Sequence, residues 1–558
     1  MKFRKAAAFA AALSLIVCGA RMGFAANEEA DPHIVAEEAG GEELRSLSDG
    51  SVLPEGGVLP AYGDSLLDFG GTEENEALLV GASTLPSSYR IKNLPPVSDQ
   101  GAYSTCWTYA TMNSSQINLL KAGYGSGADF SEYQLLYDVF HGETDTFIPT
   151  RSWYDSPGSY MYSTAALARN YGAGDAAVYP YNISKTLSAE EMIDDIALID
   201  HVIWPGTWPT SQSDWKGDAW EQQTLLIKQL LKSEGAMVVS YNSHSERDTA
   251  NNSYYTAWGS GSKPSPDHAI TLIGWDDEKT TQAGSGAYLA MNSYGEDSIY
   301  DENGFFWVSY DDASLQDPAV FVMEEREPGI VRDPLAFSWT GTGLGLSWKT
   351  NRSAKAANVY TPDQAVCVDR IGLYLPAGVS FSVQLYKGLT DSAQPESGTA
   401  AASASGNTEY KGFFKADLSK AVEIAKGESF SLVVQITDGS ARYFLAEGAS
   451  KTYQTTAISE GQSFYYDGSS WLDVKGGVTV SSQTVNCGNF CIYAYGYEQL
   501  TLGDAGLDGS VGLDDLLLTA RHVAGKSSLS GSALRAADYN KSGAVDHKDM
   551  EGIAALLL

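Results

Sequence analysis

Cys106 stands far from every other cysteine in the chain, and its surroundings suit a nucleophilic thiol. The residues after it have helical spacing up to a stop at Gly123, and Ser104 or Thr105 could cap the helix. Because the dipole and free amides of a helix N-terminus favour a thiolate, we expect Cys106 to be nucleophilic rather than inert. Gln100 lies six residues upstream, where its side-chain amide could donate to a developing oxyanion.

A nucleophilic thiolate also needs a histidine and a group that orients this histidine. Of the seven histidines, His268 opens a pattern typical of a buried strand, whereas the others lie in acidic, polar or irregular stretches. A second strand pattern runs to Asn292. An antiparallel hairpin that turns around residues 276–285 would pair Trp275 with Gly286. The same register brings His268 close to Asn292, so the spacing predicts a cysteine–histidine–asparagine constellation.

Several blocks resemble the papain family of cysteine peptidases, in the family's order and over roughly residues 85–325. The blocks that carry the resemblance are Gln100-Gly101 with Cys106-Trp107, Gly158-Ser159-Tyr160, Asp267-His268-Ala269 and Asn292-Ser293-Tyr294-Gly295. The resemblance implies an α/β (α+β) domain of two lobes, with helices on one side of a cleft and a β-barrel on the other. It implies amide hydrolysis through an acyl-enzyme, with no cofactor for catalysis.

The resemblance also assigns roles within this site. Cys106 is expected to attack the peptide carbonyl. His268, oriented by Asn292, is expected to hold the thiolate as an ion pair and to protonate the leaving amine. Gln100 and the backbone amide of Cys106 are expected to stabilise the oxyanion. The residues expected at the substrate are Gly158, Ser159, Trp107 and Tyr294.

Some positions depart from the family pattern. Tyr103 stands where the family usually has a cysteine, and Tyr294 stands where a tryptophan usually shields the asparagine. Three other functions therefore stay open beside an endopeptidase: a nonenzymatic adhesin or binding protein on a degenerate peptidase fold, a transpeptidase-like acyltransferase, and an exopeptidase. The exopeptidase would need a loop that blocks one end of the cleft, for which the interval 182–225 is the candidate.

The first 25 residues resemble a signal peptide, with a charged start, a short apolar run and small residues near Ala25. Residues 26–84 hold 14 acidic side chains and one basic one, which suits a weakly ordered propeptide or linker. The whole chain has 70 acidic and 36 basic residues, and its formal net charge of −34 argues against binding nucleic acid or an anionic membrane. No later apolar run could span a bilayer, so we expect a secreted protein, extracellular or associated with the cell surface.

Residues 331–498 show alternating apolar and polar runs separated by turn residues, which predicts an all-β sandwich. This part resembles the lectin-like domain that follows the catalytic domain in some bacterial papain-like enzymes. A glycan is therefore one candidate partner, and a spacer sandwich is the alternative. Cys367 could pair with Cys487 or Cys491, because an exported protein normally forms disulfides.

Residues 500–558 hold two related acidic segments, whose spacing of oxygen-bearing side chains suits calcium-binding loops. The expected Ca²⁺ ligands are Asp504, Asp508, Ser510 and Asp515 in the first loop and Asp538, Asn540, Ser542, Ala544 (through its carbonyl), Asp546 and Asp549 in the second. Gly506 and Gly512 occupy ligand positions of the first loop, so this loop should bind calcium more weakly than the second. The duplicated layout resembles a small all-α dockerin, which implies a cohesin-bearing scaffold protein as partner.

The sequence thus predicts a secreted cysteine endopeptidase that acts on protein or peptide substrates and is attached to a scaffold. Its expected segments are a signal peptide (1–25), an acidic propeptide or linker (26–84), a papain-like peptidase domain (85–330), a lectin-like β-sandwich (331–498) and a dockerin (500–558).

Overall fold

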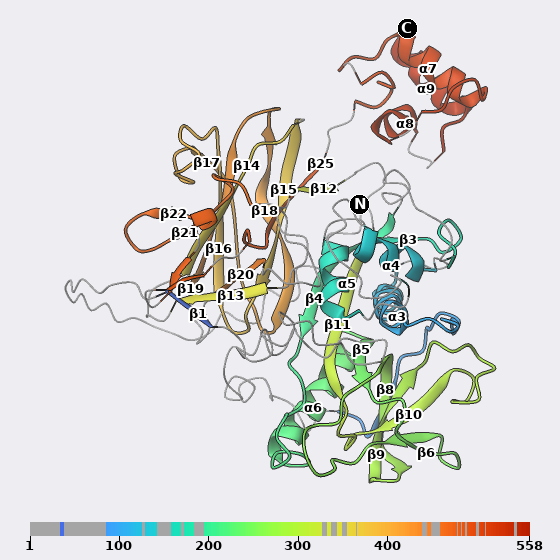
Figure 1. The fold of residues 1–558 in the computed structure, drawn as a ribbon. Helices are drawn as coiled ribbons and strands as arrows, with labels where there is room; N and C mark the ends of the chain where they lie inside the picture. The colour runs from blue at the N-terminus through green and yellow to red at the C-terminus, as the bar shows by residue number, and fades with distance from the viewer. Residues whose placement is uncertain are drawn as a thin grey trace. The chain divides into compact units, whose positions relative to one another are not determined.

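The computed structural model describes residues 34–37, 85–124, 129–141, 154, 158–168, 172–182, 195–325, 332–335, 343–348, 354–363, 365–437, 443–447, 458–476, 478–480, 483–485, 488–497, 501–507, 509–529, 531–540 and 544–558 (Figure 1). The predicted signal peptide, the calcium ligands Asp508 and Ser542, and Cys487 lie outside these residues. Within the acidic segment, strand β1 (Ile34–Glu37) pairs antiparallel with β13 (Gly343–Trp348). A strand there differs from the weak order expected of this segment.

Helix α3 (Cys106–Lys121) begins at the predicted residue. Thr105 is its N-cap, and Gly123, with a φ of 91°, follows its end. The prediction that the cysteine lies at a helix N-terminus is therefore confirmed. Helices α4 (Glu132–His141) and α5 (Tyr160–Ala166) pack beside α3 (Figure 1).

Helix α3 is a central element that is buried on every side from Cys106 to Leu119. A helix with this many polar residues can be buried only if their side chains find hydrogen-bond partners. The hydroxyls of Thr108 and Thr111 donate to backbone carbonyls of the preceding turn. The hydroxyl of Ser114 donates to the Ala236 carbonyl at 2.8 Å. These bonds explain why the helix has no exposed face, although its spacing indicates only one apolar face.

The described strands from residue 88 to residue 325 form one sheet with the order β4-β11-β5-β8-β9-β10-β7-β6, and β2 and β3 pair with β8 and β4. Their bounds are β2 (Ser88–Arg90), β3 (Ala173–Gly174), β4 (Asp195–Trp204), β5 (Met237–Tyr241), β6 (Glu246–Asp248), β7 (Ser253–Tyr255), β8 (His268–Thr281), β9 (Gly284–Met291), β10 (Phe305–Ser309) and β11 (Gln316–Glu325). Helix α6 (Asp218–Ser233) packs against β8 through buried residues at helical spacing, among them Trp220 and Leu230.

The hairpin of β8 and β9 has a different register from the expected one. Trp275 lies opposite Tyr288 and not opposite Gly286. The strands continue to a tight turn at Gln282 and Ala283, and their pairing shifts at two irregular points. The expected register was therefore wrong by two residues, because the polar stretch taken for a long turn belongs mostly to the strands.

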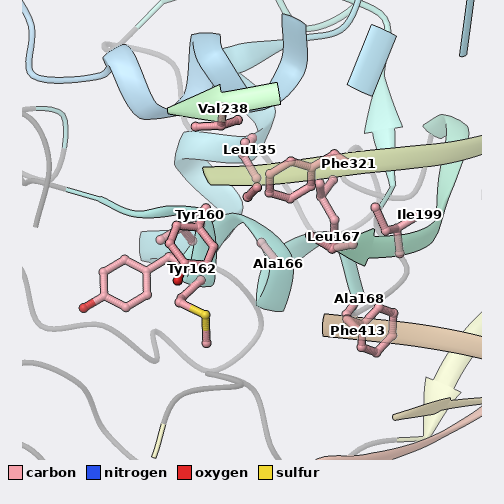
Figure 2. Packing of buried hydrophobic residues seen from close by; sticks show 14 of the residues in the cluster. Leu135, Tyr160, Tyr162, Ala166, Leu167, Ala168, Ile199, Val238, Phe321 and Phe413 are labelled. Atoms are coloured by element: carbon pink, nitrogen blue, oxygen red, sulfur yellow. The ribbon is translucent and has the colours of Figure 1, made fainter. Parts of the chain in front are cut away.

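A cluster of buried side chains joins the helices to the sheet (Figure 2). Leu135 of α4 and Tyr160 of α5 belong to the same cluster as Val238 of β5 and Phe321 of β11. Because burial of one such side chain contributes about 1.5–3 kcal/mol, this cluster fixes the helical part against the strands.

The region from residue 332 to 497 is all-β within its described residues, as predicted, apart from the 3-10 helix η6 (Val474–Gly476). One sheet has the order β17-β16-β19-β14-β21-β22, and a second series runs β12-β25-β15-β18. The bounds of these and the remaining strands are β12 (Arg332–Leu335), β14 (Ala354–Tyr360), β15 (Val366–Leu375), β16 (Ser380–Lys387), β17 (Thr399–Asn407), β18 (Lys411–Ile424), β19 (Phe430–Thr437), β20 (Tyr443–Glu447), β21 (Ser463–Tyr466), β22 (Trp471–Asp473), β23 (Val478–Val480), β24 (Gln483–Val485) and β25 (Ile492–Tyr497).

Strand β18 also pairs with β4, so a single mixed sheet continues from the first region into the second. Gly412 lies opposite Ile203, and a Cβ there would fall 1.9 Å from the Val202 carbonyl oxygen, so the close approach requires glycine. Arg370 of β15 forms an ion pair with Glu324 of β11, with 2.5 Å between nitrogen and oxygen. The sequence gives no sign of this joint sheet, because each predicted domain has its own strand pattern.

The C-terminal region holds three short helices, α7 (Leu513–Val523), α8 (Gly531–Ala537) and α9 (His547–Leu556), and α7 packs against α9. Their assignment to a dockerin stays a prediction. None of the described helices is both long and apolar enough to cross a membrane.

Cys106 and Cys367 are buried free thiols, and Cys491 is also buried. The expected pairing through Cys487 lies outside the described residues.

Candidate active site

Cys106 lies where helix α3 meets strand β8. Its side chain is 1% exposed, and the backbone N–H of Ala269 donates to its Sγ at 3.4 Å. Burial raises the pKa of this thiol to about 12, while hydrogen bonds from the backbones of Ala269 and Trp107 lower it. The amides at the helix start thus act in the expected direction. Burial outweighs them, so the thiol is protonated at neutral pH in this state.

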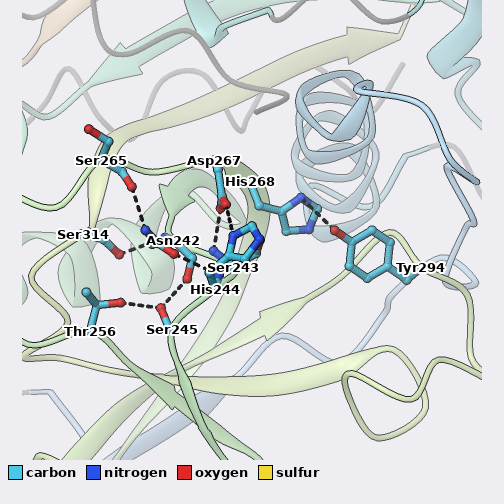
Figure 3. Close-up of polar contacts among 10 residues, drawn as sticks. All are labelled: Asn242, Ser243, His244, Ser245, Thr256, Ser265, Asp267, His268, Tyr294 and Ser314. Atoms are coloured by element: carbon cyan, nitrogen blue, oxygen red, sulfur yellow. Dashed lines mark hydrogen bonds and ion pairs between the residues drawn. The ribbon is translucent and has the colours of Figure 1, made fainter. Parts of the chain in front are cut away.

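His268 opens strand β8 and is also buried. Its Nε2 lies 2.9 Å from Oδ1 of Asn292, and because an amide oxygen only accepts, Nε2 carries the hydrogen. The other nitrogen, Nδ1, is therefore the one that can take up a proton. The Tyr294 hydroxyl lies 3.4 Å from Nδ1, and the two rings stack with centroids 4.8 Å apart (Figure 3). Burial lowers the pKa of His268, and the bond to Asn292 raises it.

Asn292 follows strand β9 directly and has partners at both ends of its side-chain amide. Its Oδ1 accepts from the backbone N–H of Ser293 at 2.9 Å as well as from His268. Its Nδ2 donates to Oδ2 of Asp301 at 2.7 Å. Sequence reasoning found the histidine and the asparagine but missed Asp301, because an aspartate in a polar loop carries no periodic signal.

Gln100 is buried and held by two hydrogen bonds. The Ser293 hydroxyl donates to its Oε1 at 2.6 Å, and its Nε2 donates to the Tyr103 carbonyl at 2.7 Å. An amide nitrogen carries two hydrogens, so Nε2 has a second one to offer an oxyanion. The structure thus brings the predicted glutamine against the block that begins at Asn292.

The residues expected to contact the substrate differ in their exposure. Trp107 is 1% exposed and stacks edge-on against Phe140, so its indole lies in the core and not at a surface where a substrate binds. Gly158 packs over it so closely that a Cβ would lie 2.1 Å from the indole. Ser159 is partly exposed as the N-cap of α5, and Tyr294 is partly buried beside His268.

A second cluster of polar contacts lies next to His268 and was not expected (Figure 3). The exposed His244 places Nδ1 2.5 Å from Oδ2 of Asp267, and the N–H of Ser243 donates to Oδ1 at 2.6 Å. The charge of Asp267 raises the pKa values of both Cys106 and His268. Sequence reasoning assigned His244 to the surface and gave no hint of this contact.

The two predicted calcium loops share one feature. Asp515 accepts from the backbone N–H groups of Gly506 and Gly512, at 2.6 and 2.7 Å. Asp549 accepts in the same way from Asn540 and Asp546, at 3.0 and 2.8 Å. Within the described part of the chain, no group of three or more His, Cys, Asp or Glu side chains is arranged to hold a metal ion. Ser, Asn and carbonyl ligands fall outside that criterion, so the calcium sites stay a prediction.

Residues 86–322 match the family model described as papain family cysteine protease. This match confirms the predicted cysteine-type peptidase. Residues 336–496 match the model of the lectin-like domain, which confirms the second predicted module.

Two solved structures of the clostridial cysteine protease Cwp84 are similar to the chain. One shows the cysteine protease and lectin-like domains of Cwp84, a surface layer associated protein of Clostridium difficile. It has a TM-score of 0.62 and 19% identity, and the match covers 84% of this chain and 98% of that one. The other shows Cwp84 after propeptide cleavage, with a TM-score of 0.58, 19% identity and coverage of 74% and 100%. At this identity the likeness shows a shared fold. A comparison with curated proteins found no match.

Proposed function

We propose that the protein is an extracellular or cell-surface endopeptidase that cleaves peptide bonds through an acyl-enzyme on Cys106. The observation that supports this most is the contact of His268 with Asn292 at 2.9 Å, next to a cysteine at a helix N-terminus. The printed description of Cwp84 as surface layer associated supports the proposed location.

In the proposed mechanism, Cys106 and His268 rest as a neutral pair, since burial disfavours both charged forms. As Sγ attacks the peptide carbonyl, its proton passes to Nδ1 of His268. The Nε2–H group of His268 meanwhile keeps its hydrogen bond to Oδ1 of Asn292. Gln100 and the backbone N–H of Cys106 stabilise the oxyanion. The imidazolium then protonates the leaving amine. Water next attacks the thioester, His268 takes up its proton, and the thiol is restored on release of the acid.

This proposal is tested by incubating the full chain with a peptide library under reducing conditions, beside Cys106→Ala and Cys367→Ala. The second variant removes a buried thiol in the lectin-like domain and is expected to keep full activity. Internal cleavage that only Cys106→Ala abolishes supports the endopeptidase.

The other outcomes contradict the proposal in distinct ways. Removal of residues from one peptide end alone indicates an exopeptidase. Incorporation of an added amine without hydrolysis indicates an acyltransferase. No cleavage by any variant indicates a nonenzymatic binding protein on a peptidase fold.

We further propose that residues 500–558 form a calcium-binding dockerin that attaches the protein to a cohesin-bearing scaffold, and that the lectin-like domain contacts glycans. The support for calcium is that the last carboxylate of each loop, Asp515 and Asp549, turns back into its own loop. In calcium-binding loops of the EF-hand type, the residue at this position is a ligand of the ion.

Calcium is expected to bind the full chain and to stabilise this region, by about 2.7 kcal/mol when Ca²⁺ is present at a hundred times its dissociation constant. Titration calorimetry measures the binding, and calorimetric unfolding with and without a chelator measures the stabilisation. Asp538→Ala removes the first ligand of the second loop and should abolish most of the effect. Equal thermograms with calcium and with chelator would contradict the metal sites.

A further inference from the structure

Asp301 is a buried carboxylate that contacts the active site through Asn292. It is 6% exposed, and its Oδ2 accepts from Nδ2 of Asn292 at 2.7 Å. Its Oδ1 accepts from the backbone N–H of Gly304 at 3.0 Å. The Gly304 carbonyl in turn accepts from the backbone N–H of Asn292 at 2.9 Å. Asp301 and Asn292 are therefore held against each other by both backbone and side chains.

The turn that carries Asp301 has little freedom. Gly304 has a φ of 82°, and a Cβ there would lie 2.5 Å from the side chain of Val97, so the position requires glycine. Burial raises the pKa of Asp301, whereas hydrogen bonds from Asn292 and Gly304 and the charge of Arg247 lower it. Both carboxylate oxygens are thus fixed in place and engaged by N–H donors.

This arrangement decides which way the Asn292 amide points. An ionised carboxylate only accepts hydrogen bonds, so the NH₂ group of Asn292 must face Asp301. The oxygen of Asn292 then faces His268, where Nε2 must carry the hydrogen. If the amide were reversed, its NH₂ group would meet Nε2, and the hydrogen of the imidazole would move to Nδ1. That tautomer could not accept the thiol proton.

We propose that Asp301 is a positioning residue of the protease site, the last member of a hydrogen-bonded chain that runs His268–Asn292–Asp301 beside Cys106. Its carboxylate fixes the orientation of Asn292 and thereby keeps His268 in the tautomer whose Nδ1 accepts the proton of Cys106. This inference rests on the proposed function, since it requires Cys106 and His268 to be the reacting pair.

The direct test is Asp301→Asn. An asparagine here has a single acceptor oxygen, so either Nδ2 of Asn292 or the N–H of Gly304 loses its acceptor. We expect kcat to fall roughly 10- to 100-fold with KM nearly unchanged, because the reacting groups lose their alignment and the substrate contacts do not.

The pH profile of the thiol gives a second readout that a merely structural role would not move. The rate at which iodoacetamide alkylates Cys106, followed by mass spectrometry of its peptide, falls at acid pH when Nδ1 of the neutral His268 takes up a proton and can no longer accept that of the thiol. Without the negative charge behind Asn292, the imidazolium is less stabilised, and this acid limb should shift to lower pH. The groups that face His268, namely Asp267, Tyr241 and Tyr294, are unchanged in the variant.

The matched control is Asp312→Asn. Asp312 is fully buried and accepts from the N–H of Thr256 and from Ser314, but it has no contact with Asn292. It should lower the thermal midpoint as Asp301→Asn does and leave kcat and the acid limb at wild-type values. A double-mutant cycle with Asn292→Ala tests whether Asp301 acts through Asn292. If it does, Asp301→Asn should change kcat less than about threefold in the Asn292→Ala background.

Two results would overturn the inference. One is a folded Asp301→Asn with wild-type kcat and acid limb. The other needs no variant: nitrogen NMR of histidine-labelled wild-type protein that finds the neutral His268 protonated at Nδ1 and not at Nε2. Absence of any cleavage or Cys106 alkylation by the wild type would instead overturn the proposed function, so the two failures are distinguishable.

Discussion

His268→Ala is expected to lower kcat/KM by at least about a thousandfold. Burial raises the pKa of Cys106 to about 12, so without an adjacent base roughly one thiol in 10⁵ is ionised at pH 7. In the proposed mechanism, Nδ1 of His268 takes up the thiol proton during attack, and the thiol need not ionise in advance. The variant loses this acceptor, together with the proton donor for the leaving amine.

The measurement is kcat/KM together with the alkylation rate of Cys106 from pH 5 to pH 10. The wild-type alkylation rate should rise as Nδ1 of His268 loses its proton and should then level off, whereas that of His268→Ala should rise steadily with pH, because only hydroxide then removes the thiol proton. His201→Ala is the control, since His201 lies on β4 and bonds to Asp200. Activity of His268→Ala within tenfold of the wild type would remove this residue from the mechanism.

Asn118→Leu is expected to destabilise the protease domain by about 3 kcal/mol. The side chain of Asn118 is buried near the end of α3, where Nδ2 donates to the carbonyls of Ala236 and Phe321, both at 2.9 Å. Its Oδ1 accepts from the N–H of Ala236 at 2.6 Å. Leucine has a similar volume but satisfies none of these backbone groups. The helix that carries the nucleophile therefore loses its tie to β5 and β11.

Urea unfolding followed by tryptophan fluorescence measures this effect, because Trp107 and Trp220 are buried in the folded domain and become exposed when it unfolds. Ser115→Ala is the matched control on the same helix. The Ser115 hydroxyl is buried and has no hydrogen-bond partner within the described part of the chain, so its removal should change stability by less than about 0.5 kcal/mol. Equal urea midpoints for Asn118→Leu and Ser115→Ala would show that the amide contributes nothing to stability.

The sequence predicts those parts of the site whose signal is local. The helix start at Cys106 follows from capping and spacing, and the strand that opens at His268 follows from its apolar run. The meeting of His268 with Asn292 was predicted from a register that is wrong by two residues at Trp275 but by only one next to the site, where Thr271 pairs with Met291. It is nevertheless present, because the pairing shifts between Leu272 and Gly274 and both residues lie at strand ends on the same side of the hairpin.

Other parts of the site could not be predicted because they depend on where loops come together. The bond of Ser293 to Gln100 spans 193 positions of sequence, and that of Asp301 to Asn292 depends on a turn made possible by Gly304. The placement of Trp107 was wrong for a related reason. Position in a motif does not tell on which side of a backbone the indole packs, and here it lies beneath Gly158.

The pairing of β18 with β4 has a consequence for how this protein can be divided. The part of β4 from His201 to Trp204 has a second neighbour only through β18, so in the protease domain alone this part would be an edge with unsatisfied N–H and C=O groups. Such an edge recruits other strands, so an excised protease domain is prone to self-association. The two modules are thus coupled by shared backbone hydrogen bonds, and loss of structure in one is transmitted directly to the other.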